Sequence, residues 1–541
     1  MTEVCDVIVL GTGAAGLTAA LAAHEGSADV RVIERFDRIG GTSAISGGVI
    51  WTANNPRQRA AGLADSREEA LAYFRALDHG DLREDVLEAF VDCGPEALAF
   101  LEGIDALRVS LLAGYPDYYL DRPGAKPEGG RALDHDLFAL GELGDWAARI
   151  YAIEELKPMM LRETPLGGGS GMVPPVELQR RIAADERGFG QAMVGRLLKA
   201  CLDRGIEPQL GVQTRRLTME DGRVCGIEGE QGDAPFKLRA RSGVIVATGG
   251  FEWDADLRRT FLRGPADTPA SPPTACGEGL ALAMAAGARL GNMTSAWWAP
   301  TLAPPGDRWP GGEQRAAPVL IERTVPHSLM VNRAGKRFCN EAANYSALAG
   351  AFHAFDPQSY AYPNQPAWLV FDSQHRARNP VGTVMPGDPL PDWIASADTL
   401  VELANQLRID GEALVASVDR FNRFARDGHD PDFARGTSAY DHFYGDRSRN
   451  GAAVTLGALE QPPFFAVEIR MGMLGTNGGP QTDANARILG HDGAPIPGLY
   501  GAGNAIACPT GGVYAGAGGT LGPAITFGYI AGRAAAPANA A

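Results

Sequence analysis

The stretch that decides the fold is VIVLGTGAAGLTAALAAHEGSADVRVI, residues 7–33. Its apolar run Val7–Leu10 predicts a strand, the small residues Leu17–His24 predict a helix, and Val30–Ile33 predicts a second strand. Glycines separate the first strand from the helix, so the chain turns tightly there. This succession indicates the first strand–helix–strand unit of a parallel α/β sheet.

The spacing of the glycines predicts a dinucleotide site. In Gly11-Thr12-Gly13-Ala14-Ala15-Gly16, the first glycine permits the turn, the second lets a pyrophosphate approach the backbone, and the third lets the helix pack on the sheet. The unpaired N–H groups of the helix N-terminus then face the phosphates. Glu34 directly follows the second strand, where a ribose hydroxyl needs an acceptor.

A second small-residue loop indicates FAD as the dinucleotide. Residues 40–48 read GGTSAISGG. A domain that binds only NAD has no need of such a loop, whereas FAD extends beyond the pyrophosphate and its isoalloxazine ring needs a flat bed of small residues. The loop contains no histidine, so a histidyl–flavin bond is excluded there and we expect non-covalent FAD.

Later segments complete the same domain. Ile206–Leu217 followed by Gly222–Gly226 predicts a strand pair that lays its backbone against adenine. Residues 244–250 (VIVATGG) and 498–504 (GLYGAGN) each predict a buried strand that ends in a glycine turn. GGTLGPA, starting at Gly518, opens an apolar helix from Ala524 to Arg533, whose N-terminus can stabilise negative charge on a reduced flavin.

These segments define the expected cofactor contacts. The residues are Gly11, Gly13, Ala14, Ala15, Gly16, Glu34, Arg35, Gly41, Thr42, Ser43, Ser46, Gly47, Gly48, Val212, Ala247, Thr248, Gly249, Gly503, Asn504, Gly519, Thr520 and Leu521.

Both ends of the chain therefore contribute to one domain. We predict an α/β fold in which a Rossmann-like FAD-binding domain with a parallel sheet, split in sequence over residues 1–292 and 455–541, carries an inserted α+β substrate (catalytic) domain over residues 293–454. In the insert, prolines and tryptophans cluster near its start and helical patterns return at Thr399–Asp427.

Composition limits the partners and the compartment. With 49 basic and 65 acidic residues the formal net charge is −16, which argues against nucleic acid or an anionic membrane surface as the main partner. The seven cysteines are scattered and form no CxxC pair, so we expect reduced, buried thiols and no metal site. No apolar run approaches the ~18 residues that span a bilayer, and the N-terminus lacks the basic start of a signal peptide. We therefore expect a soluble cytoplasmic protein of a bacterium.

The motifs together resemble the flavoprotein superfamily of the fumarate reductase/succinate dehydrogenase type, over essentially the whole chain. They are Gly11–Gly16, Glu34, Gly40–Gly48, Ala247–Gly250, Val331–Phe338 and Pro497–Asn504. The dicarboxylate reductases of this superfamily place an Arg in the final glycine loop and a His before the glycine-rich strand. Here Gly511–Gly519 contains no Arg and Met471–Thr476 contains no His, so a fumarate-like substrate is disfavoured.

Three tyrosines and a glycine stand in contexts similar to those of 3-ketosteroid Δ1-dehydrogenases. Tyr118 lies in YPDYY, Tyr345 in NEAANY, and Tyr514 four residues before Gly518. The chain departs from the common family pattern at Ala343-Asn344-Tyr345, where Ser-x-Pro-Tyr is frequent, and at Tyr514-Ala515-Gly516, where Tyr-Pro-Gly is common. The Pro-Asp-Tyr tripeptide favours Tyr118, and Tyr119 stays open as the alternative.

The resemblance implies a desaturation beside a ring ketone. The Tyr514 hydroxyl and the Gly518 N–H stabilise negative charge on the carbonyl oxygen, an effect of ~3–4 kcal/mol per donor. Tyr345 takes the α-proton, and a hydrogen bond from Tyr118 favours the Tyr345 phenolate, since a free phenol has a pKa near ~10. FAD accepts the hydride from the β-carbon.

Several readings remain open at this point. The lead is 3-ketosteroid Δ1-dehydrogenation with an external electron acceptor, for which a quinone is the candidate. The same chemistry on a small cyclic ketone such as cyclohexanone is the first alternative, and an ene or fumarate-type reductase working in the reverse direction is the second. A flavin- or nucleotide-binding protein without turnover is the third. The ketone, the acceptor, the direction in the cell and the oligomeric state are not given by the sequence.

Overall fold

The computed structural model describes residues 3–153 and 158–537, and the chain divides into two compact units. Unit 1 comprises residues 1–261, 274–296 and 475–541, and unit 2 comprises residues 262–273 and 297–474. Unit 1 is thus assembled from both ends of the chain, and unit 2 is built mainly from the middle of it.

The sheet of unit 1 is parallel at its centre. β1 (Glu3–Leu10) pairs in parallel with β2 (Val30–Ile33) on one side and with β10 (Ala234–Val246) on the other, and β10 pairs in parallel with β20 (Pro495–Gly501). β19 (Arg487–Leu489) closes this edge in the antiparallel sense. The predicted α/β fold with a parallel sheet split in sequence is confirmed.

An antiparallel extension leaves the same sheet. β8 (Val212–Glu220) pairs with β9 (Arg223–Gln231), and β9 pairs with the first half of β10. The strand pair expected from residue 206 onwards is therefore present, but its first strand begins only at Val212.

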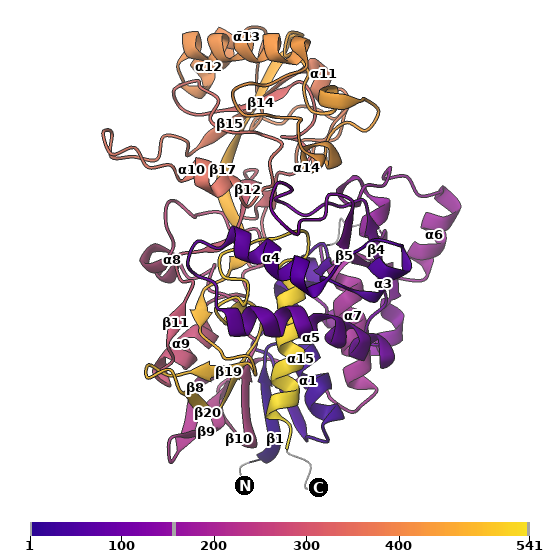
Figure 1. Ribbon diagram of the computed structural model, residues 1–541, viewed down its shortest axis with the longest axis vertical. Helices are drawn as coiled ribbons and strands as arrows, with labels where there is room; N and C mark the ends of the chain where they lie inside the picture. Colours follow the sequence, from indigo (N-terminus) through magenta and orange to yellow (C-terminus); the bar gives the residue numbers. More distant parts are fainter. Residues whose placement is uncertain (1–2, 154–157, 538–541) are drawn as a thin grey trace. The chain divides into compact units, whose positions relative to one another are not determined.

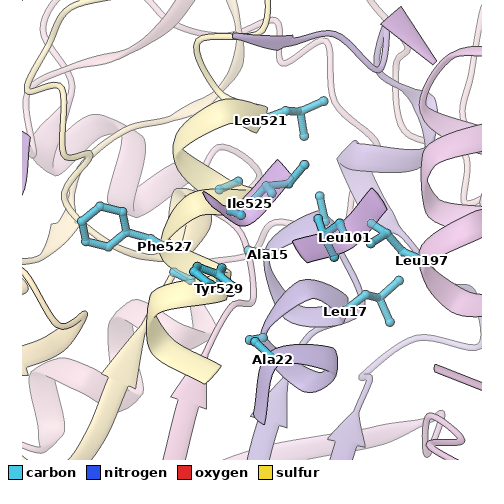
Figure 2. Close-up of a cluster of buried hydrophobic side chains, with 14 of the residues drawn as sticks. Ala15, Leu17, Ala22, Leu101, Leu197, Leu521, Ile525, Phe527 and Tyr529 are labelled. Carbon is cyan, nitrogen blue, oxygen red and sulfur yellow. The ribbon is translucent and has the colours of Figure 1, made fainter. Parts of the chain in front are cut away.

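Two apolar helices cover the centre of this sheet. α1 (Ala14–Glu25) and α15 (Leu521–Ala535) lie against each other, one from each end of the chain (Figure 1). A Cβ at Gly528 would lie 2.5 Å from the carbonyl oxygen of Ala15, so only glycine allows the helices to approach this closely. Figure 2 shows Ile525 and Tyr529 of α15 and Leu17 and Ala22 of α1 in the cluster of buried side chains around this contact.

Two local predictions differ from the structure. The loop Gly40–Gly48 contains a short helix, α2 (Gly41–Ile45), because Gly40 and Gly41 adopt positive φ angles that turn the chain into a helical start. α15 begins at Leu521 and not at Ala524, because Pro523 fits the first turn of a helix, where its missing N–H costs nothing.

The other elements of unit 1 surround this core. They are β3 (Ile50–Trp51), α3 (Pro56–Ala60), α4 (Arg67–Leu77), α5 (Glu84–Gly103), β4 (Val109–Ala113), β5 (Gly129–His135), β6 (Phe138–Ala139), η1 (Leu140–Arg149), η2 (Leu161–Glu163), η3 (Pro165–Gly167), α6 (Pro175–Ala183), β7 (Glu186–Arg187), α7 (Phe189–Leu202), α8 (Ala255–Phe261), α9 (Glu278–Ala285), β11 (Leu290–Gly291), β18 (Gly479–Pro480) and η5 (Gly503–Ala505).

Unit 2 is built on a second sheet, with the order β13-β12-β17-β15-β14 and β16 paired to β17. Its elements are β12 (Ala296–Leu302), β13 (Ala317–Pro318), β14 (Ser328–Val331), α10 (Leu348–Phe352), β15 (Ala367–Asp372), α11 (Ser373–Arg376), β16 (Ala395–Ala397), α12 (Leu400–Leu407), α13 (Gly411–Asp427), α14 (Ala439–Phe443), η4 (Gly451–Val454) and β17 (Phe464–Thr476).

The boundary of unit 2 differs from the one placed at residue 454 by composition. β17 pairs with β15 along its first half, from Phe464 to Ile469, so the chain leaves the second sheet only near Leu474. Residues 262–273 also pack with unit 2. Strand pairing, which composition does not reveal, decides these boundaries.

Candidate active site

Four strands of unit 1 end in one row of paired residues. Leu10 of β1 lies opposite Ile33 of β2 and opposite Val246 of β10, and Val246 lies opposite Gly501 of β20. Because the strands are parallel, the segments that follow them leave the sheet at the same edge. Ligands of open α/β sheets bind at this carboxyl edge.

The first glycine turn fits this edge closely. Gly11 has φ +105°, and a Cβ there would overlap the carbonyl oxygen of Ala247, the residue after β10. Gly13 precedes α1 and provides no side-chain cap, so the first turn of α1 keeps N–H groups for a ligand. Gly503, from the other end of the chain, lies beside Ala15 of α1, with 3.0 Å to the Ala15 Cβ from a built Cβ.

Glu34 is held by three donors of the same edge. Its Oε2 accepts hydrogen bonds from the N–H of Thr12 at 3.1 Å and from the Thr12 hydroxyl at 2.6 Å, and its Oε1 accepts from the N–H of Phe36 at 3.1 Å. Burial raises the pKa of Glu34, and these donors oppose the rise. Thr12, which our sequence analysis did not single out, also accepts from the N–H of Gly40 at 3.1 Å and so joins the two glycine loops.

The second loop presents one serine at the N-terminus of α1. The N–H of Ala14 donates to Oγ of Ser43 at 3.1 Å, so the Ser43 hydroxyl hydrogen is left for another acceptor. The Ser46 hydroxyl instead donates to the carbonyl of Ser43 at 2.8 Å and accepts from the N–H of Gly48. The structure thus gives Ser46 a part in shaping the loop, and its contact with FAD stays a prediction.

Three further predicted contacts, Val212, Arg35 and Thr248, lie close to strand ends of this edge. The N–H of Val212 donates to the carbonyl of Glu34 at 3.0 Å, which places the start of β8 beside the end of β2. Arg35 forms an ion pair with Glu278, at 2.6 Å. The Oγ1 of Thr248 is buried and has no partner among the described residues, an unsatisfied group that a bound cofactor would satisfy. The residues of this edge therefore fit FAD.

Two of the predicted active-site tyrosines meet in unit 1. The rings of Tyr118 and Tyr514 lie edge to face, with centroids 5.4 Å apart and planes at 69°. Both side chains are buried, with 5% and 4% exposed. Tyr119 is only half-buried, and its N–H donates to the hydroxyl of Tyr73. This geometry favours Tyr118 over Tyr119.

The carbonyl of Ala515 joins the two tyrosine segments. It accepts from the N–H of Tyr118 at 3.0 Å and from the hydroxyl of Tyr73 at 2.8 Å. Burial raises the pKa of Tyr73, so its phenol remains a donor. Tyr73 is a second residue that our sequence analysis missed, since nothing in helix α4 marks it apart from other buried aromatic residues.

Gly518 has a backbone conformation that glycine adopts and other residues rarely do. Its φ is +88°, and a Cβ there would come within 2.5 Å of the backbone nitrogen of Trp51. Its carbonyl accepts from the N–H of Trp51 at 3.2 Å, while no acceptor within residues 3–153 and 158–537 receives its own N–H. Gly519, next in sequence, leaves room for the ring of Tyr514, 2.7 Å from a built Cβ.

Tyr345 belongs to unit 2 and is buried there. The preceding segment is held by Arg323, a fully buried side chain that donates to the carbonyls of Glu341 and Ala343, the latter at 2.8 Å. The side chain of Asn344 accepts from the N–H of Ala347 at 2.8 Å, which fixes the turn around Tyr345. The structure thus gives Tyr345 a defined backbone position within its own unit.

The comparisons with known proteins support FAD as the cofactor. Residues 6–521 match the protein family described as "FAD binding domain".

The chain belongs to the FAD-binding-domain family.

Two relatives and one solved structure match this family member over nearly its whole length. It is 41% identical over 535 residues to 4-oxocyclohexanecarboxylate 2-dehydrogenase of Sinomonas cyclohexanicum, covering 98% of this chain and 92% of the relative. It is 37% identical to 3-oxosteroid 1-dehydrogenase of Mycobacterium tuberculosis, covering 97% of each chain. The crystal structure of 3-ketosteroid Δ1-dehydrogenase from Sterolibacterium denitrificans in complex with 1,4-androstadiene-3,17-dione matches with a TM-score of 0.89 and 34% identity, covering 98% and 99% of the two chains.

The chain is therefore an FAD-dependent oxidoreductase, as the sequence predicts. No helix of the described residues is long and apolar enough to cross a membrane. All seven cysteines are free thiols, of which Cys5, Cys201, Cys225 and Cys339 are buried. Cys93, Cys276 and Cys508 are only half-buried, so the expectation of uniform burial is wrong for these three.

Proposed function

We propose that this FAD-dependent enzyme introduces a carbon–carbon double bond next to the carbonyl of a ring ketone. The observation that carries the proposal is the contact between Tyr118 and Tyr514, in the loop that leads to Gly518. The resemblance assigns Tyr514 and Gly518 to the polarisation of a carbonyl and Tyr118 to the support of the base. The names of the relatives support it, because both are dehydrogenases of oxo-substituted rings.

The proposed reaction removes one proton from the α-carbon of the ketone and one hydride from its β-carbon. The Tyr514 hydroxyl and the Gly518 N–H donate to the carbonyl oxygen, so the α-carbon becomes acidic enough for the oxygen of Tyr345 to take its proton. The residues of the carboxyl edge, Glu34 and Thr12 among them, would hold FAD, which we propose to be non-covalent and which would supply the acceptor for the β-hydrogen as hydride. An external acceptor, for which we propose a quinone, then receives two electrons. The hydrogen bond from Tyr118 to Tyr345 stays a prediction, because the two tyrosines belong to different units.

Two ring classes are candidates for the substrate. A 3-ketosteroid is supported by the match to the steroid enzymes, including a structure whose ligand is a steroid dienone. A monocyclic ketone that carries a carboxylate is supported by the 41% identical relative. The absence of Arg from Gly511–Gly519 and of His from Met471–Thr476 disfavours the fumarate-type alternative.

Anaerobic reduction of the bound flavin tests the proposal. The purified yellow protein is titrated with a 3-ketosteroid, with 4-oxocyclohexanecarboxylate and with cyclohexanone, and the flavin absorbance is followed. We expect at least one ketone to bleach the flavin stoichiometrically and the oxidised product to carry an α,β double bond by mass and ultraviolet spectrum. Flavin that stays oxidised with all three ketones would overturn the proposal, and the most efficient ketone identifies the ring class.

A further inference from the structure

Trp51 touches two parts of the proposed active site at once. Its indole N–H donates to Oδ1 of Asp117 at 2.9 Å, and Tyr118 is the next residue in sequence. Its backbone N–H donates to the carbonyl of Gly518 at 3.2 Å. One residue therefore bridges the segment of Tyr118 and the loop of Gly518.

The indole ring has little freedom to move. Trp51 is 1% exposed, its ring stacks on Phe90 with centroids 6.1 Å apart, and the ring of Phe74 meets it edge-on at 5.3 Å. A Cβ at Gly516 would lie 2.7 Å from the indole, so the loop that follows Tyr514 rests directly on the ring. A displacement of the indole would therefore displace this loop.

Asp117 is fixed from the opposite side by buried charge. Its Oδ2 accepts from Nη1 of Arg131 at 2.8 Å and from the N–H of Lys126 at 3.0 Å. The guanidinium of Arg131 also binds the two oxygens of Asp65, at 2.6 and 2.9 Å. Asp117 and Arg131 are 3% and 1% exposed. Because the transfer of such ions from water into the protein is costly, the network is weak evidence for a gain in stability. It is better explained by the fixed position that it gives to the Asp117 carboxylate.

We propose that Trp51 and Asp117 are a pair of positioning residues that sets the spacing between the Tyr118 segment and the loop of Tyr514 and Gly518. This inference rests on the proposed function, in which Tyr514 and Gly518 donate to the carbonyl oxygen. Donors to a developing charge act only from fixed positions, and a displacement of ~1 Å can lower a rate ~100-fold. Loss of the pair should therefore weaken binding of the negatively charged enolate more than binding of the neutral ketone.

The test compares ligand affinities in the FAD-loaded holoenzyme. The probe is 4-cyanophenol, whose phenolate carries a negative oxygen on a planar six-membered ring and so mimics the enolate. Its affinity and that of cyclohexanone are measured by calorimetry in the wild type, in Trp51→Phe, in Asp117→Ala and in the double variant. Phe100→Leu is the matched control, because Phe100 lies on the same helix α5 as Phe90 and packs against Tyr529, away from the bond between Trp51 and Asp117.

We expect Trp51→Phe to lower the affinity for the phenolate about 10-fold. The FAD content and the affinity for cyclohexanone should stay within twofold of the wild-type values. The double variant should lose no more phenolate affinity than the more severe single variant, because both substitutions remove the same bond between the indole N–H and Asp117. The positioning pair would be overturned if folded Trp51→Phe bound the phenolate within twofold of the wild-type affinity. An equal loss of phenolate affinity in Phe100→Leu would also overturn it. If no ketone reduces the wild-type flavin, the proposed reaction fails, and the phenolate affinities still decide on the pair. A wild type without phenolate affinity overturns both.

Discussion

The ring of Tyr118 meets the ring of Tyr514 edge to face, with their centroids 5.4 Å apart. The carbonyl of Ala515 accepts the N–H of Tyr118, so the two rings are tied by the backbone as well as by packing. Aromatic pairs in this geometry contribute ~0.5–1.5 kcal/mol beyond the area that they bury. The contact thus orients two phenols that the proposed function needs.

Removal of single hydroxyls should separate the roles of the tyrosines. Tyr345→Phe is expected to slow anaerobic flavin reduction by several orders of magnitude with FAD retained, because the base is lost. Tyr514→Phe should weaken ketone binding and slow reduction ~100- to 1,000-fold, the loss typical of one oxyanion donor. Stopped-flow absorbance measures both. Tyr115→Phe, beside Tyr118 at 6.4 Å between centroids, is the control, and a loss there as large as in Tyr514→Phe would contradict the assignment.

Gly518→Ala should slow turnover strongly without loss of FAD. A Cβ at Gly518 meets the backbone of Trp51, and φ +88° is unfavourable for alanine, so the N–H must leave its position. We expect flavin reduction to fall at least ~100-fold. Gly512→Ala is the matched control in the same loop, because its Cβ would meet nothing closer than 3.5 Å. Equal rates in the two variants would remove Gly518 as a donor.

Glu34 should determine FAD affinity and not ketone preference. Glu34→Ala and Thr12→Val each remove the 2.6 Å bond between these side chains, and a hydrogen bond to a charged group contributes ~1.5–3 kcal/mol. We expect FAD to dissociate ~10- to 100-fold more readily, measured by fluorescence of released flavin. Glu230→Gln, an exposed carboxylate on β9 that pairs with Arg215, is the control and should leave occupancy unchanged.

Stability should fall in mild acid because of His135. Burial lowers the pKa of His135 to about 3, and its Nε2 has no partner in the part of the chain that the structure describes. Between about pH 3 and ~6.5 only the unfolded chain binds this proton, so the free energy of unfolding rises with pH over this range. Above ~6.5 neither state binds the proton, and the contribution of His135 to stability is fully present.

Urea unfolding at pH 7 and pH 5 measures this contribution. The slope from one such group is at most ~1.4 kcal/mol per pH unit. His135→Leu should flatten the pH dependence by up to this amount, whereas His79→Leu, at an exposed position, should not. An unchanged slope in His135→Leu would contradict the prediction.

Local sequence patterns were enough to predict the parallel sheet, the helix after Gly11 and the cofactor class. These features depend on local backbone requirements: a glycine at φ +105°, apolar runs of strand length, and a carboxylate directly after the second strand. Such local requirements produce a pattern within a few tens of residues. The segment from Val7 to Glu34 therefore predicts its strand–helix–strand unit and its dinucleotide site without knowledge of the rest of the fold.

Which side chains contact one another became known from the folded structure alone. It brought Tyr118 to Tyr514, joined Thr12 to Glu34, and placed Trp51 between Asp117 and Gly518. In the structure the second unit ends at Leu474 and not at residue 454, because β17 pairs with β15. Such contacts join segments that are far apart in the chain, and they form only when the whole core packs, so no local pattern encodes them.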